Sequence, residues 1–190
     1  MTDYCPCICN IANTWANFRF VDSGSMNLNE RETMEFKSFK AQVNILDKLE
    51  GESIRERYIE KFVNSTHSQY QEQIQKKYKF RDGYCYLGYL WDYMKEPTII
   101  DEHYIRSKRK DIGDVYVFWD IHSCERILIK DYWKFGKRDI INLNFDVLIK
   151  GAMYLPEDIY IFDASYMWTM VMTHENINGK RYCIKCGNID

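Results

Sequence analysis

The sequence predicts an α+β fold in which an N-terminal pair of helices packs on an antiparallel sheet of four to six strands. Two periodicities carry this prediction, and they occupy different parts of the chain. Residues 28–79 have apolar side chains at helical spacing, whereas residues 114–186 contain short segments rich in β-branched and aromatic residues. Several connections between these segments are short enough for hairpins, which favours antiparallel pairing.

Length and composition favour a single folded domain. The chain has 190 residues, of which 46% are hydrophobic and 16% aromatic, so it can bury a substantial core. The formal net charge of -2 gives no overall basic field for nucleic acid. We expect residues 1–27 to be irregular, 28–79 to form a helical arm and 80–190 to form the sheet core.

The sequence indicates a cytoplasmic protein without membrane association. No apolar run approaches the roughly 20 residues that cross a bilayer. The N-terminus lacks the basic and apolar regions of a signal peptide. In the cytoplasm the seven cysteines would be mostly reduced, which disfavours a disulfide framework.

Two antiparallel helices are expected in the N-terminal half. The first covers 28–50, and Gly51 is expected to stop it because glycine is common just past a helix end. The second covers 52–78, although its middle, 64–68, is a poor helix interior. The aromatic-rich stretch 84–94 is expected to form a further short helix.

The C-terminal half is expected to contain five strands: Asp114–Ile121, Arg126–Lys130, Ile159–Asp163, Met167–His174 and Arg181–Ile184. A helix over 142–153 is expected to cross the sheet. Asn178-Gly179, between the last two strands, is the strongest hairpin signal because this pair suits a type I′ turn. Three mid-strand residues are predicted to lie in the core: Trp119, Ile161 and Trp168.

Cys183 and Cys186, followed by Gly187, have the spacing of half a zinc knuckle. Two thiolates at this spacing can bind one tetrahedral Zn²⁺ as a structural ion. The other ligands would come from three N-terminal cysteines or a histidine: Cys5, Cys7, Cys9 and His174. The chain has no second C-x-x-C pair, so a redox dithiol or two unliganded thiols are the alternatives.

A second candidate site is a polar cluster of five residues. Asp120, His122 and Cys124 alternate, so a continuous strand would place them on one face, as a thiol nucleophile with a base and an orienting group requires. Such positions lie roughly 6.5–7 Å apart along a strand, so hydrogen-bonded turn residues are the alternative. His174 and Glu175 end another strand, where His174 can equally be an ordinary edge residue.

The motif inventory favours a binding protein over an enzyme. The chain contains no G-x-G-x-x-G, P-loop, G-x-S-x-G or H-E-x-x-H sequence. The basic run 106–110 suits either a phosphate contact or a solvated loop.

The stretch Leu155-Pro156-Glu157-Asp158-Ile159-Tyr160-Ile161-Phe162-Asp163, with Trp168-Thr169 and Thr173-His174-Glu175 after it, resembles the C-terminal part of small bacterial proteins of unknown function. Some of those proteins resemble immunity proteins, which neutralise toxins of neighbouring cells. The resemblance implies a cytosolic protein that binds a protein partner, and it assigns no active-site residue.

Three functions are therefore open. The first is a bacterial protein-binding module of the immunity or antitoxin type. The second is a zinc-stabilised protein associated with nucleic acid, based on the C-x-x-C-G sequence and the basic run. The third is a small hydrolase-like enzyme that uses Asp120, His122 and Cys124. A deep polar pocket at His122 would favour the third function.

Overall fold

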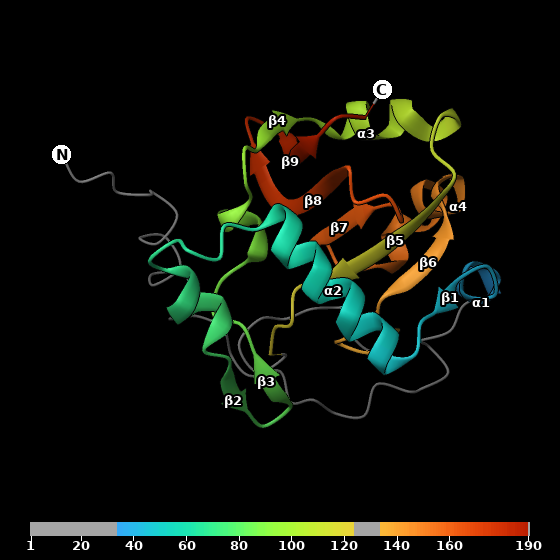
Figure 1. Ribbon diagram of the computed structural model, residues 1–190. Helices are drawn as coiled ribbons and strands as arrows, with labels where there is room; N and C mark the ends of the chain where they lie inside the picture. The colour runs from blue at the N-terminus through green and yellow to red at the C-terminus, as the bar shows by residue number, and fades with distance from the viewer. Residues whose placement is uncertain (1–33, 124–133, 190) are drawn as a thin grey trace. The chain divides into compact units, whose positions relative to one another are not determined.

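Seven strands form one antiparallel sheet in the computed structural model, which describes residues 34–123 and 134–189 (Figure 1). The strand order is β1-β6-β5-β7-β8-β9-β4. The strands are β1 Asn44–Ile45, β4 Thr98–Ile100, β5 Asp114–Trp119, β6 Ile141–Asn144, β7 Ile159–Phe162, β8 Trp168–Ile177 and β9 Lys180–Gly187. The α+β class is confirmed. The sheet exceeds the predicted four to six strands because β1 and β4 come from outside residues 114–186.

Four α-helices lie among the described residues: α1 Met34–Lys40, α2 Lys48–Phe62, α3 Glu102–Ser107 and α4 Phe145–Gly151. Shorter helical segments are the π-helix Gln71–Gln75 and the 3₁₀ helices Leu90–Tyr93, Lys108–Lys110 and Ala152–Tyr154. A small two-stranded sheet pairs β2 Tyr78–Phe80 with β3 Gly83–Cys85. No helix in the described part of the chain is long and apolar enough to cross a membrane.

The two faces of the large sheet are covered by different helices. On one face, α1, α3 and α4 pack on the side chains that include Val117 and Trp119 of β5. On the other face, α2 packs on Phe118 of the same strand. Figure 1 shows α2 in front of the sheet. Because neighbouring strand residues point to opposite faces, one strand supplies both core layers. The described residues belong to one compact unit, and α2 contributes Tyr58 and Phe62 to its second core layer.

The predicted N-terminal helical pair differs from the observed helices. In place of a helix over 28–50, the described residues form α1, the short strand β1 and the first three residues of α2. The carboxylate of Asp47 caps α2 by accepting from the Leu49 and Glu50 N–H groups at 2.9 and 3.0 Å. Gly51, predicted to stop a helix, lies inside α2 and is buried. Since α1 and α2 contribute to different core layers, they do not pack as a pair.

Other predicted helices are also shorter than expected. The stretch 52–78 stops being α-helical at Phe62, and residues 64–68 interrupt it as their composition suggests. The stretch 84–94 contains the end of β3 and a 3₁₀ helix. In the stretch 142–153, residues 142–144 belong to β6 and the helix begins only at Phe145. Asn144 sets this start by capping α4, because its side-chain oxygen accepts from the Asp146 N–H at 3.0 Å.

Four predicted strands of the C-terminal half are present as β5, β7, β8 and β9, whereas β6 forms where the start of a helix was predicted. Ile177 pairs with Lys180 across the β8–β9 turn, and Asn178 and Gly179 have φ angles of 53° and 77°, as a type I′ turn requires. All three residues predicted to lie in the core are buried: Trp119, Ile161 and Trp168. The predicted strand Arg126–Lys130 lies outside the described residues, as do residues 1–27.

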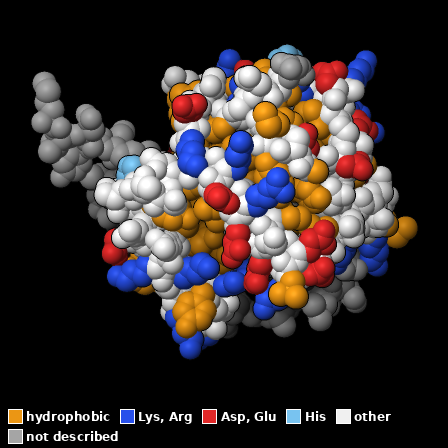
Figure 2. All heavy atoms as spheres, in the orientation of Figure 1, with side chains coloured by type: hydrophobic (Ala, Val, Ile, Leu, Met, Phe, Trp, Pro, Cys, Tyr) orange, Lys and Arg blue, Asp and Glu red, His pale blue; other side chains and the backbone are white. Residues whose placement is uncertain are grey.

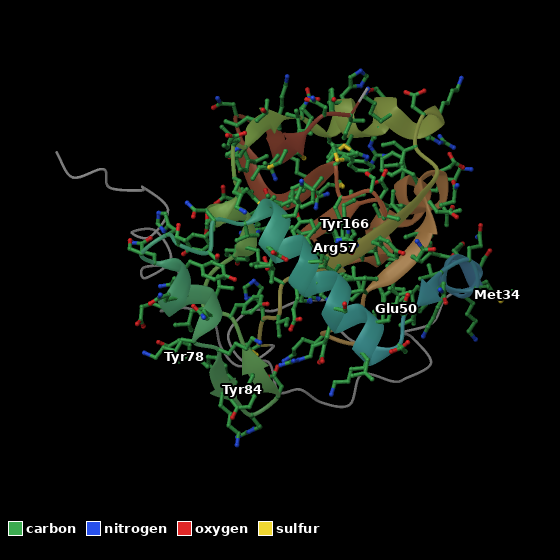
Figure 3. All side chains as sticks on the ribbon, in the orientation of Figure 1. Met34, Glu50, Arg57, Tyr78, Tyr84 and Tyr166 are labelled. Carbon is green, nitrogen blue, oxygen red and sulfur yellow. The ribbon has the colours of Figure 1, made fainter. Side chains whose placement is uncertain are left out.

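Helix α2 is held on the sheet by aromatic and cationic contacts. Tyr58 packs edge-on against Phe118 at 4.8 Å between ring centroids, and its hydroxyl is 2.9 Å from Oγ1 of Thr169. Arg57 lies over the ring of Tyr166, 4.3 Å from its centroid, and both are labelled in Figure 3. Figure 2 shows basic and acidic side chains interspersed over this face, so no charge of one sign dominates it.

Candidate functional site

The sheet register gathers several polar residues at one end of the large sheet. Trp119, Ile159, Met172 and Cys183 form a cross-strand row through β5, β7, β8 and β9. The residues just beyond this row therefore lie close together, although they are distant in sequence. They include Asp120, which follows β5, and Asp158, which precedes β7. They also include His174, which lies in β8 two residues beyond Met172.

A buried hydrogen-bond network surrounds Asp120, which is only 1% exposed. Its carboxylate accepts from the hydroxyl of Tyr160 at 2.7 Å and from the Leu90 N–H at 3.3 Å. The Trp91 N–H in turn donates to the Tyr160 hydroxyl oxygen at 2.9 Å. Burial raises the pKa of Asp120 to about 8, an effect that the Tyr160 hydrogen bond reduces.

The two histidines of the predicted cluster are joined by an aromatic side chain. His122 is buried and packs edge-on against Tyr89 at 4.6 Å between ring centroids. The Tyr89 ring also contacts the ring of His174, with centroids 5.0 Å apart. The Tyr86 N–H donates to the Ile121 carbonyl at 2.7 Å, which fixes this segment against the end of β5. The structure thus brings Asp120, His122 and His174 into one region.

The outward-facing part of this region is acidic and aromatic. Asp158 accepts from the His174 backbone N–H at 2.9 Å, and Nδ1 of the His174 ring is 2.9 Å from both carboxylate oxygens. This hydrogen bond raises the pKa of His174. Loss of surrounding water, followed by the nearby carboxylates of Glu175 and Asp158, raises the pKa of Asp92 to about 6. We call Tyr89, Asp92, Asp158, His174 and Glu175 the acidic–aromatic rim.

The raised pKa of Asp120 predicts a specific pH dependence of stability. The folded protein keeps the Asp120 proton up to about pH 8, whereas the unfolded chain releases it near its ordinary value of 3.8. The unfolded state therefore binds fewer protons in this window, and the free energy of unfolding falls as pH rises. Asp120→Asn should gain stability relative to the wild type between about pH 4 and 8, measured by urea denaturation across pH.

Tyr160→Phe provides the comparison for this experiment. It removes a hydrogen bond that lowers the Asp120 pKa, so the pH-dependent loss of stability should extend to higher pH. Parallel pH profiles for the wild type and Asp120→Asn would contradict the assignment of this effect to Asp120.

A pocket of about 370 Å³ lies at the opposite end of the sheet. Its lining combines carboxylates with apolar and aromatic side chains: Asp111, Ile112, Gly113, Asp114, Asp163, Trp168, Asn188 and Ile189. Trp168 forms part of its wall and donates its indole N–H to Asp163 at 3.0 Å. Of the predicted polar cluster, the four residues that the structure describes (Asp120, His122, His174 and Glu175) do not line this pocket.

The two cysteines of the C-x-x-C sequence lie in different core layers. β9 is a regular strand here, so residues three positions apart point to opposite faces. Cys183 packs with the α1, α3 and α4 side of the sheet, whereas Cys186 packs with the α2 side. Burial raises the pKa of each thiol to about 11. This geometry gives no support for one zinc ion shared by both sulfur atoms.

The remaining metal and nucleic-acid candidates can be placed only in part. Cys5, Cys7, Cys9 and Cys124 lie outside the described residues. Within the described ranges, no group of three or more His, Cys, Asp or Glu side chains is arranged to hold a metal ion. In the basic run, Arg106 pairs with Glu102 and Arg109 pairs with Asp146, so both guanidinium groups already have acidic partners.

Sequence reasoning identified part of this region and missed its connections. Tyr89, Trp91 and Tyr160 join the predicted residues, and none of them was expected to take part. The only sequence signal for Tyr89 and Trp91 is the aromatic density of residues 84–94, which fits a buried segment equally well. Tyr160 lies in the predicted strand Ile159–Asp163, where its hydroxyl gave no sign of a partner. Asp158 comes directly before a predicted strand, but its pairing with His174 depends on the register of β7 and β8.

A comparison of the chain with protein-family models, with curated proteins and with solved structures found no match.

Proposed function

We propose that this chain is a cytosolic bacterial protein-binding module, of the type of immunity protein or antitoxin that neutralises a toxic partner. The observation that carries the proposal is the division between buried and outward-facing groups at one end of the sheet. Asp120 and His122 are buried within the core, where Asp120 accepts hydrogen bonds from the Tyr160 hydroxyl and the Leu90 N–H. The acidic–aromatic rim faces outward beside them, which suits recognition of a surface more than conversion of a small substrate.

The composition of the rim supports a protein partner. Protein interfaces favour aromatic side chains that combine a large contact area with a polar tip. Tyr89 is half-buried and stacks on Trp91 with ring centroids 5.3 Å apart, so part of its side chain is accessible to a partner.

A growth assay tests this function. The protein encoded by the adjacent reading frame is expressed in a bacterial host, alone and together with this chain. We expect growth arrest when it is expressed alone, relief by co-expression, and a complex that survives size-exclusion chromatography. An empty vector is the control. Arrest that co-expression does not relieve, or the absence of a complex, would count against the proposal.

A second candidate is a small hydrolase-like enzyme that uses Asp120, His122 and Cys124. The favouring observation is that Asp120 and His122 are buried together after β5, and that the Asp120 pKa of about 8 suits proton transfer near neutral pH. Cys124→Ser should then abolish turnover of activated ester substrates while the thermal stability is preserved. Equal rates for the wild type and this variant would exclude the thiol mechanism.

A further inference from the structure

The acidic–aromatic rim combines negative charge with aromatic surface. Asp158, Glu175 and Asp92 lie near one another, since the carboxylates of the first two raise the pKa of the third. The ring of Tyr89 contacts the histidine that Asp158 binds. Carboxylates beside an aromatic ring attract lysine and arginine side chains through ion pairing and cation–π contact. The rim is therefore complementary to a basic surface.

Trp91 supplies an independent observation in the same region. Its side chain is only 8% exposed, and its indole N–H has no acceptor within residues 34–123 and 134–189. Its ring centroid is 6.3 Å from that of His174 and 6.1 Å from that of Tyr182. An unpaired buried donor is unfavourable, so it favours a ligand that brings an acceptor. A polypeptide offers both the basic side chain and a backbone carbonyl.

We propose that the acidic–aromatic rim binds a basic segment of the protein partner, with an arginine or lysine side chain placed between Tyr89 and the carboxylates of Asp158 and Glu175. This inference rests on the proposed function and specifies its contact surface. The Tyr89 ring covers Trp91 in the free protein, so we expect it to shift and expose the indole N–H to a carbonyl of the bound segment.

The same contact is sensitive to pH. The charged and titratable groups around His174 are Asp158 and Glu157 before β7, Glu175 on β8, Asp92 and Tyr89 after β3, and Arg181 on β9. At low pH the protonated ring of His174 neutralises part of the carboxylate charge. As pH rises and His174 loses its proton, the rim becomes more negative, so affinity for a basic segment should increase.

Calorimetric titration of the full chain tests the inference, with a blocked peptide of alternating arginine and glycine at low ionic strength. The glutamate–glycine peptide is the probe of opposite charge. We expect the arginine peptide to bind more tightly at about pH 8 than at about pH 5.5. Asp158→Asn and Glu175→Gln should each weaken binding by about fivefold, the scale of one exposed charge pair.

Matched variants separate the rim from general charge. Asp114→Asn removes one carboxylate at the opposite end of the sheet and should leave the affinity unchanged. His174→Gln should reduce the difference between the two pH values. Thermal denaturation identifies any variant that fails to fold, and Glu175→Gln keeps the test valid if Asp158→Asn does so. An NMR shift of the Trp91 indole N–H, assigned with Trp91→Phe, should accompany binding.

Three results would overturn the inference: no binding of the arginine peptide, equal binding of the glutamate peptide, or equal losses in Asp114→Asn and Glu175→Gln. A partner that is neutralised in the growth assay while the rim variants bind it normally would leave the proposed function intact and refute this contact. If the growth assay fails while the arginine peptide still binds specifically at the rim, the contact stands and the proposed function is refuted.

Discussion

Replacing Trp168 with alanine is expected to lower the free energy of unfolding by about 3–5 kcal/mol, the usual range for removing a large aromatic side chain from a core. Trp168 is 6% exposed, belongs to the core layer under α1, α3 and α4, and donates its indole N–H to Asp163 at 3.0 Å. The substitution leaves a cavity and removes this hydrogen bond. The midpoint of thermal unfolding should fall by about 6–20 °C.

The neighbouring residue provides the control for this experiment. Met167 is 62% exposed, so Met167→Ala should change the free energy of unfolding by less than about 0.5 kcal/mol. Urea denaturation of both variants makes the comparison. Equal free energies of unfolding for Trp168→Ala and Met167→Ala would show that packing of Trp168 does not stabilise the core at this end of the sheet.

Replacing Gly187 with alanine is expected to cost about 2–5 kcal/mol, because two unfavourable effects act together. Gly187 has a φ angle of 76°, a backbone conformation that is energetically unfavourable for residues with a Cβ atom. A Cβ atom there would also lie 2.1 Å from the carbonyl oxygen of Met167, so β8 and β9 would have to separate.

Two other glycines separate these effects. Gly179 has a φ angle of 77° but open space around its Cα, so Gly179→Ala should show the backbone penalty of about 1–2 kcal/mol alone. Gly113 has neither a positive φ nor a close neighbour, and Gly113→Ala should be nearly neutral. Chemical denaturation should rank the losses as Gly187, then Gly179, then Gly113. Equal losses for Gly187→Ala and Gly179→Ala would rule out the steric contact with β8.

The sheet was predictable where the pattern is local. β5, β7, β8 and β9 show β-rich composition, whereas β6 has the sequence Ile-Asn-Leu-Asn and does not. Asn178-Gly179 determines its own turn type. β1 and β4 have two and three residues, too few to produce a periodicity, so their places at the sheet edges depend on tertiary pairing. The first predicted helix was expected to end at Gly51, because glycine favours positions just past a helix end. Asp47 instead caps the start of α2, and the helix continues through Gly51.

The candidate site was predictable only as separate pieces. The alternation argument grouped Asp120 with His122 on one strand, but β5 ends at Trp119, before both residues. Nothing local in the sequence connects them to His174. That connection depends on Tyr89, which the Tyr86–Ile121 hydrogen bond brings to the end of β5. The C-x-x-C spacing suggested a shared ion because such pairs bind metal when they lie in a turn. In β9 the pair lies in an extended strand, and the period of two separates Cys183 from Cys186.

The short edge strands restrict how another chain can join this sheet. Strand addition, or β-augmentation, needs a row of exposed backbone N–H and C=O groups along an edge. Within the described residues the sheet ends at β1, with two residues, and at β4, with three. Each edge can offer only a short run of backbone bonds to a visiting strand. A partner should therefore be recognised through side chains, which makes its sequence, and not merely its extended shape, the basis of selectivity.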